Sequence, residues 1–314
     1  MFKNLGSFLV LKKENRLCYN VSKHYKNERR KSVPKGIVLS NISDLYKVEV
    51  DGKIIDCNAR GKFKNNEISP VAGDIVEMER IKGEVTAKEE EAKGVITKIE
   101  ERKNYLKRPK MANLSQIILV LSMKLPKPDL ELLDKQLVYA EYIGIKSIIC
   151  LNKIDLVDEE AVEKIKQVYS KIGYTVISTN AKTGEGVTEL KKCLEGHITA
   201  FSGNSGVGKS TLINSVLGEN TTEEGAISHK NKRGKNTTTQ VCLYKIGENS
   251  YIADTPGFST FDISEIEKED LAYYFVEFRE YLGKCEYGDC SHIKEANCAI
   301  KKAVEERKNI KRKI

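Results

Sequence analysis

The sequence lacks any hydrophobic run that approaches the roughly 20 residues of a membrane-spanning helix, which excludes an integral membrane protein. Residues 1–31 are basic but lack both an apolar signal core and a small-residue cleavage site, which excludes a secretory signal peptide. We therefore expect a cytoplasmic protein with no membrane partner.

Cysteine is sparse as well, with eight residues in 314, so the chain is not a disulfide scaffold. Five cysteines are scattered, whereas three cluster with a histidine near the C-terminus, which in a reducing compartment indicates a metal site. With 40% hydrophobic and 31% charged residues, the composition is that of a soluble globular protein of two or three domains. The net charge of +8 mildly favours an anionic partner, although lysine excess is also common in proteins without one.

Residues 34–101 are rich in β-forming residues. Five short strands, two of them joined by the hairpin turn Asp51-Gly52, predict a small OB-type β-barrel. Such barrels bind single-stranded nucleic acid through basic and aromatic residues, and the loop Arg60–Lys64 offers both. A purely structural barrel with a solvated loop is the alternative.

Two basic segments flank this barrel. Residues 1–33 form a basic N-terminal extension, whose Lys23–Lys31 run fits a solvated tail better than an RNA contact. Residues 102–112 form a basic linker to the next domain.

Residues 113–258 read as an α/β domain. Apolar strands at Leu114–Ser122 and Ile145–Leu151 enclose an amphipathic helix at Leu130–Ile143, which Asp129 would cap. Strand, helix and strand of these lengths predict a parallel βαβ unit. Further elements of the same kind are predicted at Asp158–Ile172, Tyr174–Ser178, Val187–Leu194 and Ile198–Ser202.

A glycine-rich loop separates the last of these strands from a helical pattern, and it matches G-x-x-x-x-G-K-[ST] without a mismatch. Its glycines let backbone N–H groups converge on phosphate oxygens at a helix N-terminus. Lys209 would reach the β- and γ-phosphates, and the Ser210 hydroxyl would ligate Mg²⁺. A chance glycine-rich turn is the alternative. The candidate phosphate-binding residues are Gly203, Asn204, Ser205, Gly206, Val207, Gly208, Lys209, Ser210 and Thr211.

Two further motifs point to guanine. In the N-K-x-D motif that follows the second strand, the Asp155 carboxylate can accept from both N1–H and N2–H₂ of guanine, a donor pair that adenine lacks. Asn152 can contact N7, and the Lys153 stem can cover the ring. An S-A-K-type loop, which braces the guanine carbonyl in GTPases through backbone N–H groups, is formed here by Asn180, Ala181 and Lys182.

The region after the phosphate loop carries the expected Mg²⁺ and γ-phosphate contacts. One threonine of Thr237–Thr239, with Thr238 as the candidate, would complete the Mg²⁺ shell. A D-x-x-G motif closes a predicted hairpin, so Asp254 would hold Mg²⁺ through water and the Gly257 N–H would contact the γ-phosphate. Phe258 follows, where Ras-like GTPases carry a glutamine that orients the attacking water.

The order of these motifs is cyclically rearranged. GTPases usually run from the phosphate loop through D-x-x-G to N-K-x-D and S-A-K, whereas here the last two come first. Because natural termini often lie close together, such a circular permutation is physically tolerable.

Residues 259–314 are expected to form a helical zinc-binding domain. An aromatic-rich helix is predicted at Ile266–Leu282 and a basic one at Ala299–Arg312, the latter a candidate RNA surface. Three thiolates and an imidazole are enough for a closed, structural Zn²⁺ site. These ligands are Cys285, Cys290, His292 and Cys298.

The combination of barrel, permuted motifs and zinc cluster closely resembles the ribosome small subunit-dependent GTPase A family of bacteria over about residues 34–300. The resemblance implies late maturation of the small ribosomal subunit, contact with its rRNA, and GTP hydrolysis stimulated by that subunit. Two departures stand out. The family usually has a histidine directly before T-T-T, whereas this chain has Asn236, which cannot accept a proton. The first 33 residues are extra to the family.

Two other functions remain open at this point. One is a permuted GTPase acting on the large subunit or another RNA, although such relatives generally lack this barrel together with a C-terminal zinc cluster. The other is a P-loop ATPase or kinase with an unrelated zinc module, which N-K-I-D and D-T-P-G disfavour. We expect a monomer that binds GTP or GDP with Mg²⁺ and one structural Zn²⁺.

Overall fold

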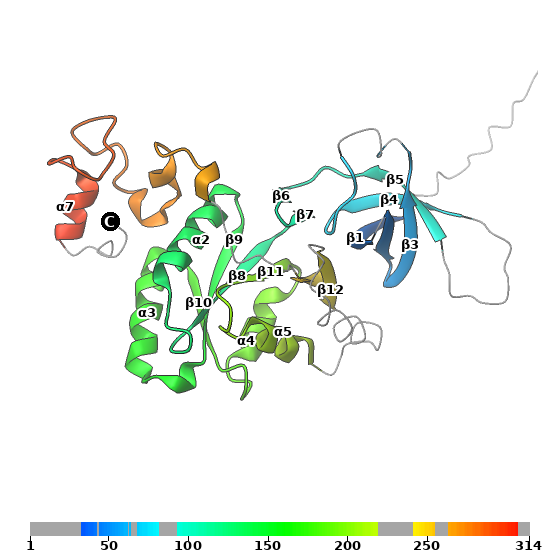
Figure 1. Ribbon diagram of the computed structural model, residues 1–314, viewed down its shortest axis with the longest axis horizontal. Helices are drawn as coiled ribbons and strands as arrows, with labels where there is room; N and C mark the ends of the chain where they lie inside the picture. The colour runs from blue at the N-terminus through cyan, green and yellow to red at the C-terminus, as the bar shows by residue number, and fades with distance from the viewer. Residues whose placement is uncertain are drawn as a thin grey trace, which may run out of the picture. The chain divides into compact units, whose positions relative to one another are not determined.

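The computed structural model describes residues 33–42, 44–61, 63, 68–81, 93–218, 241–254 and 263–306 (Figure 1). They form a β-barrel, an α/β domain and a C-terminal segment with short helices, as the sequence predicts. Within these ranges no helix combines the length and the apolar character needed to cross a membrane.

The barrel contains the five predicted strands. The strands pair in the order β1-β2-β3-β5-β4, and β4 also pairs with β1, which closes the barrel. Asp51 and Gly52 have φ values of 51° and 79°, the positive values that a tight hairpin turn requires. The strands are β1 (Lys35–Ile42), β2 (Leu45–Val50), β3 (Lys53–Ala59), β4 (Ile75–Arg80) and β5 (Lys93–Ile99).

The α/β domain is built on a mostly parallel sheet with the strand order β10-β9-β8-β11-β13-β12. Only β12 runs antiparallel, as the hairpin partner of β13. Strand β11 lies inside the sheet, between β8 and β13, so the strands of this domain that precede it in the chain lie on one side of it and those that follow lie on the other. The bounds are β8 (Gln116–Ser122), β9 (Lys146–Asn152), β10 (Thr175–Thr179), β11 (Ile198–Ser202), β12 (Cys242–Gly247) and β13 (Ser250–Asp254).

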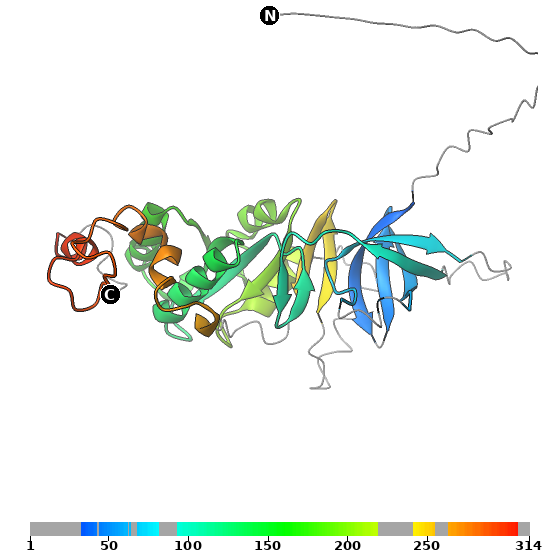
Figure 2. The same cartoon turned by 90° about the horizontal axis from the view of Figure 1, so that it is seen from above.

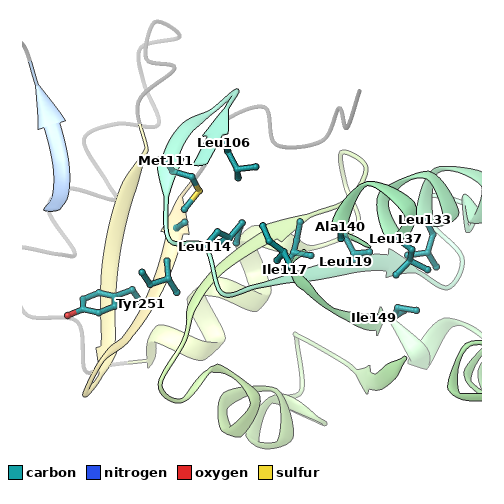
Figure 3. Packing of buried hydrophobic residues seen from close by; sticks show 14 of the residues in the cluster. Leu106, Met111, Leu114, Ile117, Leu119, Leu133, Leu137, Ala140, Ile149 and Tyr251 are labelled. Atoms are coloured by element: carbon teal, nitrogen blue, oxygen red, sulfur yellow. The ribbon is translucent and has the colours of Figure 1, made fainter. Parts of the chain in front are cut away.

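Helices cover both faces of this sheet (Figures 1 and 2). On one face, α2 (Leu130–Tyr142) and α3 (Glu159–Ile172) pack against alternate strand residues such as Leu119 and Ile149 (Figure 3). On the other face, α4 (Val187–Leu194) and α5 (Lys209–Leu217) pack against the intervening strand residues. The carboxyl ends of β8 to β11 therefore meet at one edge, where open α/β sheets bind ligands.

Two helix boundaries have clear local causes, the first of them the predicted cap Asp129. The Asp129 side chain accepts a hydrogen bond from the Leu132 N–H at 3.0 Å and so caps α2. Helix α3 ends at Gly173, whose φ of 110° favours glycine.

A buried carboxylate lies where the barrel meets the β12–β13 hairpin. Ser40 of β1 pairs with Cys242 of β12, which joins barrel and α/β strands in one sheet. Nearby, the Glu49 side chain is only 7% exposed, accepts from the Tyr251 hydroxyl at 3.1 Å and forms an ion pair with Lys245. Burial and the Glu49 charge raise the pKa of the Tyr251 hydroxyl, so it remains a neutral donor to this carboxylate.

The segment that the sequence presents as a basic linker contains a short hairpin of β6 (Tyr105–Lys107) and β7 (Lys110–Ala112). Its first residue, Arg102, binds the fully buried Asp74 through two hydrogen bonds, Nε to Oδ1 at 2.7 Å and Nη2 to Oδ2 at 2.8 Å. Such bidentate pairs are both strong and directional.

We expect Arg102→Ala to lower the free energy of unfolding by about 3–5 kcal/mol, because it leaves the Asp74 carboxylate buried without its counter-charge. Arg60→Ala is the matched control, since the Arg60–Glu79 pair is exposed on both sides and its loss should change stability by less than about 1 kcal/mol. Urea denaturation of the full chain measures both. Equal midpoints for the two variants would contradict this prediction.

The C-terminal segment contains Ala299–Glu305 of the predicted basic helix, of which residues 307–312 lie outside the described residues, and it differs from its prediction in the aromatic-rich part. Instead of one helix over Ile266–Leu282, it has two short 3₁₀ turns in that range, Leu271–Tyr274 and Val276–Phe278, and a third, Ile263–Glu265, directly before it. Its aromatic residues have low helix propensity and pack in two directions. The Tyr274 ring meets Tyr142 of α2 edge-on at 5.3 Å, whereas neighbouring aromatic rings join a separate small core with α7 (Ala299–Glu305).

Candidate functional site

The glycine-rich loop connects β11 to α5 at the carboxyl edge of the sheet. Gly203 and Gly208 have φ values of 138° and 102°, in the region that favours glycine. A Cβ at Gly203 would collide with the Val120 carbonyl oxygen, and one at Gly208 would collide with the Asn152 amide nitrogen. Both glycines are therefore required for the loop to lie against its neighbours.

Lys209 begins α5 and points back into this loop. Its ammonium donates to the carbonyl oxygens of Gly203 at 2.7 Å and Asn204 at 2.8 Å. Burial lowers the pKa of Lys209, because a partly desolvated ammonium is less stable in its charged form. Ser210 and Thr211 follow on the first turn of α5, where both are exposed. The loop thus places a lysine, two hydroxyls and a helix N-terminus together.

Asn152 links the N-K-x-D motif to two other loops. Its Nδ2 donates to the Val207 carbonyl at 2.8 Å, and its Oδ1 accepts from the Ala181 N–H at 3.2 Å and from the Thr179 hydroxyl at 3.2 Å. The side chain is 1% exposed, so these bonds are shielded from water. The glycine-rich loop, N-K-x-D and the Asn180–Lys182 loop are therefore joined through one amide.

The remaining N-K-x-D residues lie at the same edge. The Lys153 ammonium donates to the Gly206 carbonyl at 2.6 Å and also to the Leu125 carbonyl. Asp155 lies in a 3₁₀ turn, Ile154–Leu156, directly after β9, and is exposed. Its carboxylate is thus accessible next to the loop that Lys153 contacts.

The Asn180–Lys182 loop follows β10. The Asn180 side chain accepts from the Lys182 N–H at 3.1 Å, which tightens the turn, and the Ala181 carbonyl accepts from the Ser215 hydroxyl of α5 at 3.0 Å. Neither Thr179 nor Ser215 belongs to a recognisable sequence motif. The position of Thr179 at the carboxyl end of a strand, directly before the Asn180–Lys182 loop, was the available signal for this residue.

The structure describes only some of the residues that are predicted to contact Mg²⁺ and the γ-phosphate. Asp254 is the last residue of β13, and β13 pairs in parallel with β11, which carries the glycine-rich loop at its carboxyl end. Thr238 and Gly257 lie outside the described residues, as do Asn236 and Phe258.

The four predicted metal ligands form a compact cluster. Their ligating atoms all lie within 4.8 Å of one another, with His292 Nδ1 at 3.5 Å from Cys285 Sγ and 3.4 Å from Cys298 Sγ. Tetrahedral Zn²⁺, with bonds of about 2.0–2.3 Å, places its ligand atoms about 3.5–3.8 Å apart. The backbone N–H groups of Ala299 and Lys301 point at two of the sulfurs, which suits thiolates. The cluster could therefore hold a metal ion.

The sheet order, the glycine-rich loop and the two guanine-type motifs define a GTP hydrolase with circularly permuted motifs. Two family models match the chain, "RsgA N-terminal domain" over residues 35–87 and "RsgA GTPase" over residues 99–264. The chain belongs to the RsgA GTPase family.

Individual relatives match along most of the chain. The small ribosomal subunit biogenesis GTPase RsgA of Clostridium beijerinckii is 45% identical over 274 residues, which cover 87% of this chain and 91% of the relative. The crystal structure of YjeQ from Thermotoga maritima has a TM-score of 0.72 at 37% identity, covering 87% of this chain and 92% of that one. The structure of YloQ, described as a circularly permuted GTPase, has a TM-score of 0.70 at 31% identity, covering 90% and 91%.

Proposed function

We propose that this GTPase acts in the cytoplasm in the biogenesis of the small ribosomal subunit and binds its rRNA. The observation that carries the proposal is the 45% identity to a relative named for that role, over 87% of this chain. Similarity extends through both the barrel and the permuted domain, so it covers more than the nucleotide site. The net charge of +8 is consistent with an RNA partner.

In this proposal the loop Gly203–Thr211 binds the GTP phosphates, and Asp155 and the loop Asn180–Lys182 bind guanine. Geometric support comes from Asn152 and Lys153, whose side chains hold the base-recognition motif against the phosphate loop. The Lys209 ammonium is already directed into that loop, where phosphate oxygens would be stronger acceptors than the carbonyls that it now contacts. Ser210, Thr238 and, through water, Asp254 would hold Mg²⁺, which neutralises phosphate charge during hydrolysis.

We further propose that Zn²⁺ occupies the cluster of three cysteines and one histidine. The donor set, and the distances of 3.5 Å and 3.4 Å from His292 Nδ1 to two of the sulfurs, fit a closed tetrahedral site with no position left for substrate, which favours a structural ion.

The isolated protein should hydrolyse GTP slowly, because neither Phe258 nor Asn236 can act as a base toward the attacking water. We expect small subunits to raise the rate by at least about tenfold, since partner-supplied groups give other GTPases much larger gains. Steady-state phosphate release with and without purified small subunits measures this effect. Lys209→Ala should remove the stimulated rate.

Large subunits are the matched control, because the main alternative is a permuted GTPase of the large subunit. Co-sedimentation with each separated subunit shows which one binds. Fast turnover by the protein alone, unaltered by small subunits, would contradict the proposal.

A further inference from the structure

Asp129 lies in none of the nucleotide-binding motifs, yet it contacts the phosphate loop. Its Oδ1 accepts from the Leu132 N–H at 3.0 Å and caps α2. Its Oδ2 accepts from the Asn204 side-chain amide at 3.1 Å. One carboxylate therefore joins the first turn of α2 to the second residue of the glycine-rich loop.

Helix α2 contacts the loop region a second time, two turns further along. Gln136 Nε2 donates to the Ser202 hydroxyl at 3.1 Å, and both side chains are buried. Asp129 and Gln136 are seven residues apart, so they lie on the same side of the helix. Because Ser202 and Asn204 flank Gly203, α2 holds the loop on both sides of its first glycine.

The opposite end of α2 is attached to the C-terminal segment. Glu141 pairs with Arg279 at 2.7 Å, and the Tyr142 ring contacts Tyr274 edge-on. Helix α2 therefore contacts both the phosphate loop and the C-terminal segment that contains the Cys285–Cys298 cluster.

We propose that Asp129 is a positioning residue for nucleotide binding, which holds Asn204 so that the backbone N–H groups of the loop face the phosphates. The inference rests on the proposed assignment of Gly203–Thr211 as the phosphate site. Three of the first six residues of this loop are glycines, which have the largest conformational freedom to lose on ordering. A fixed Asn204 reduces that loss before the nucleotide binds.

The test separates this role from helix capping. Serine is as good a cap as aspartate but too short to cap and reach Asn204 together, so Asp129→Ser removes only the loop contact. Asn204→Ala removes the same contact from the other side. Each variant should weaken binding of a fluorescent GDP analogue about fivefold, the size expected for loss of one hydrogen bond, and Asp129→Ser should do so with kcat for GTP unchanged. The double variant should bind no more weakly than either single variant.

Glu131→Ala is the matched control, because Glu131 is in the same first turn and its ion pair is with Lys135 on the outer side. It should bind the analogue like the unmodified chain. Equal affinity of all variants, or additive losses in the double variant, would overturn the positioning role. If Asp129→Ser fails to fold, Asp129→Thr takes its place, because threonine is also a helix cap that is too short to reach Asn204 at the same time. Failure of the unmodified chain to bind the analogue would instead refute the proposed nucleotide site.

Discussion

Asp155→Asn is expected to change the preferred nucleotide from GTP to xanthosine triphosphate. The carboxylate can accept from both N1–H and N2–H₂ of guanine, whereas an asparagine amide offers a donor that matches the second carbonyl of xanthine. Asp155 is exposed directly after β9, beside the loop that Lys153 contacts, so a bound base can reach it. Sites that depend on polar matching discriminate by about 10⁴, and a change of that order in relative kcat/KM is expected.

Asp158→Asn is the control for this exchange. Asp158 is exposed three residues further on, and its side chain makes no capping hydrogen bond to α3. The same chemical change there should leave GTP preferred. Initial rates with both nucleotides measure the ratio for each variant, and an unchanged preference in Asp155→Asn would remove that residue from the base site.

Cys290→Ser is expected to release the bound metal and to loosen residues 263–306. The apolar core of that segment is small, with Phe278, Cys298, Ile300 and Ala303 as its buried members. Structural Zn²⁺ contributes on the order of 10 kcal/mol to small domains of this kind. Metal analysis should show zinc in the unmodified chain and little in the variant, and hydrogen exchange should become faster across the segment.

Cys193→Ser controls for the loss of a thiol. Cys193 lies on α4, outside the cluster, so this variant should keep its zinc and its exchange pattern. Guanine nucleotide binding should persist in both variants. Absence of zinc from the intact protein, purified without chelators, would contradict the assignment.

The geometry of the proposed nucleotide site was predictable wherever a motif has fixed spacing. The glycine-rich loop and N-K-x-D each place their residues relative to a strand end, so the sequence indicated that both lie at one sheet edge. The sequence did not indicate that Asn152 would bond to Val207, Ala181 and Thr179, because that network depends on how three loops pack.

Contacts between distant residues were not predictable for a related reason. Arg102 and Asp74 are 28 positions apart, and Glu49 and Tyr251 are 202 apart, so no local pattern connects either pair. Aromatic density at Ile266–Leu282 suggested one packed helix, but packing in two directions favours short turns instead.

During translation, β8, β9 and β10 leave the ribosome before β11, the strand that pairs with the remaining edge of β8. Every residue of β8 is buried in the complete sheet, and most of them are apolar. Until β11 is made, this apolar strand therefore has an unpaired edge. At about 5–20 residues per second, the roughly 80 residues from Ser122 to Ser202 take about 4–16 s to synthesise. The permuted order therefore leaves this edge of β8 unpaired while the N-K-x-D motif and the Asn180–Lys182 loop are synthesised, until β11 and the glycine-rich loop emerge.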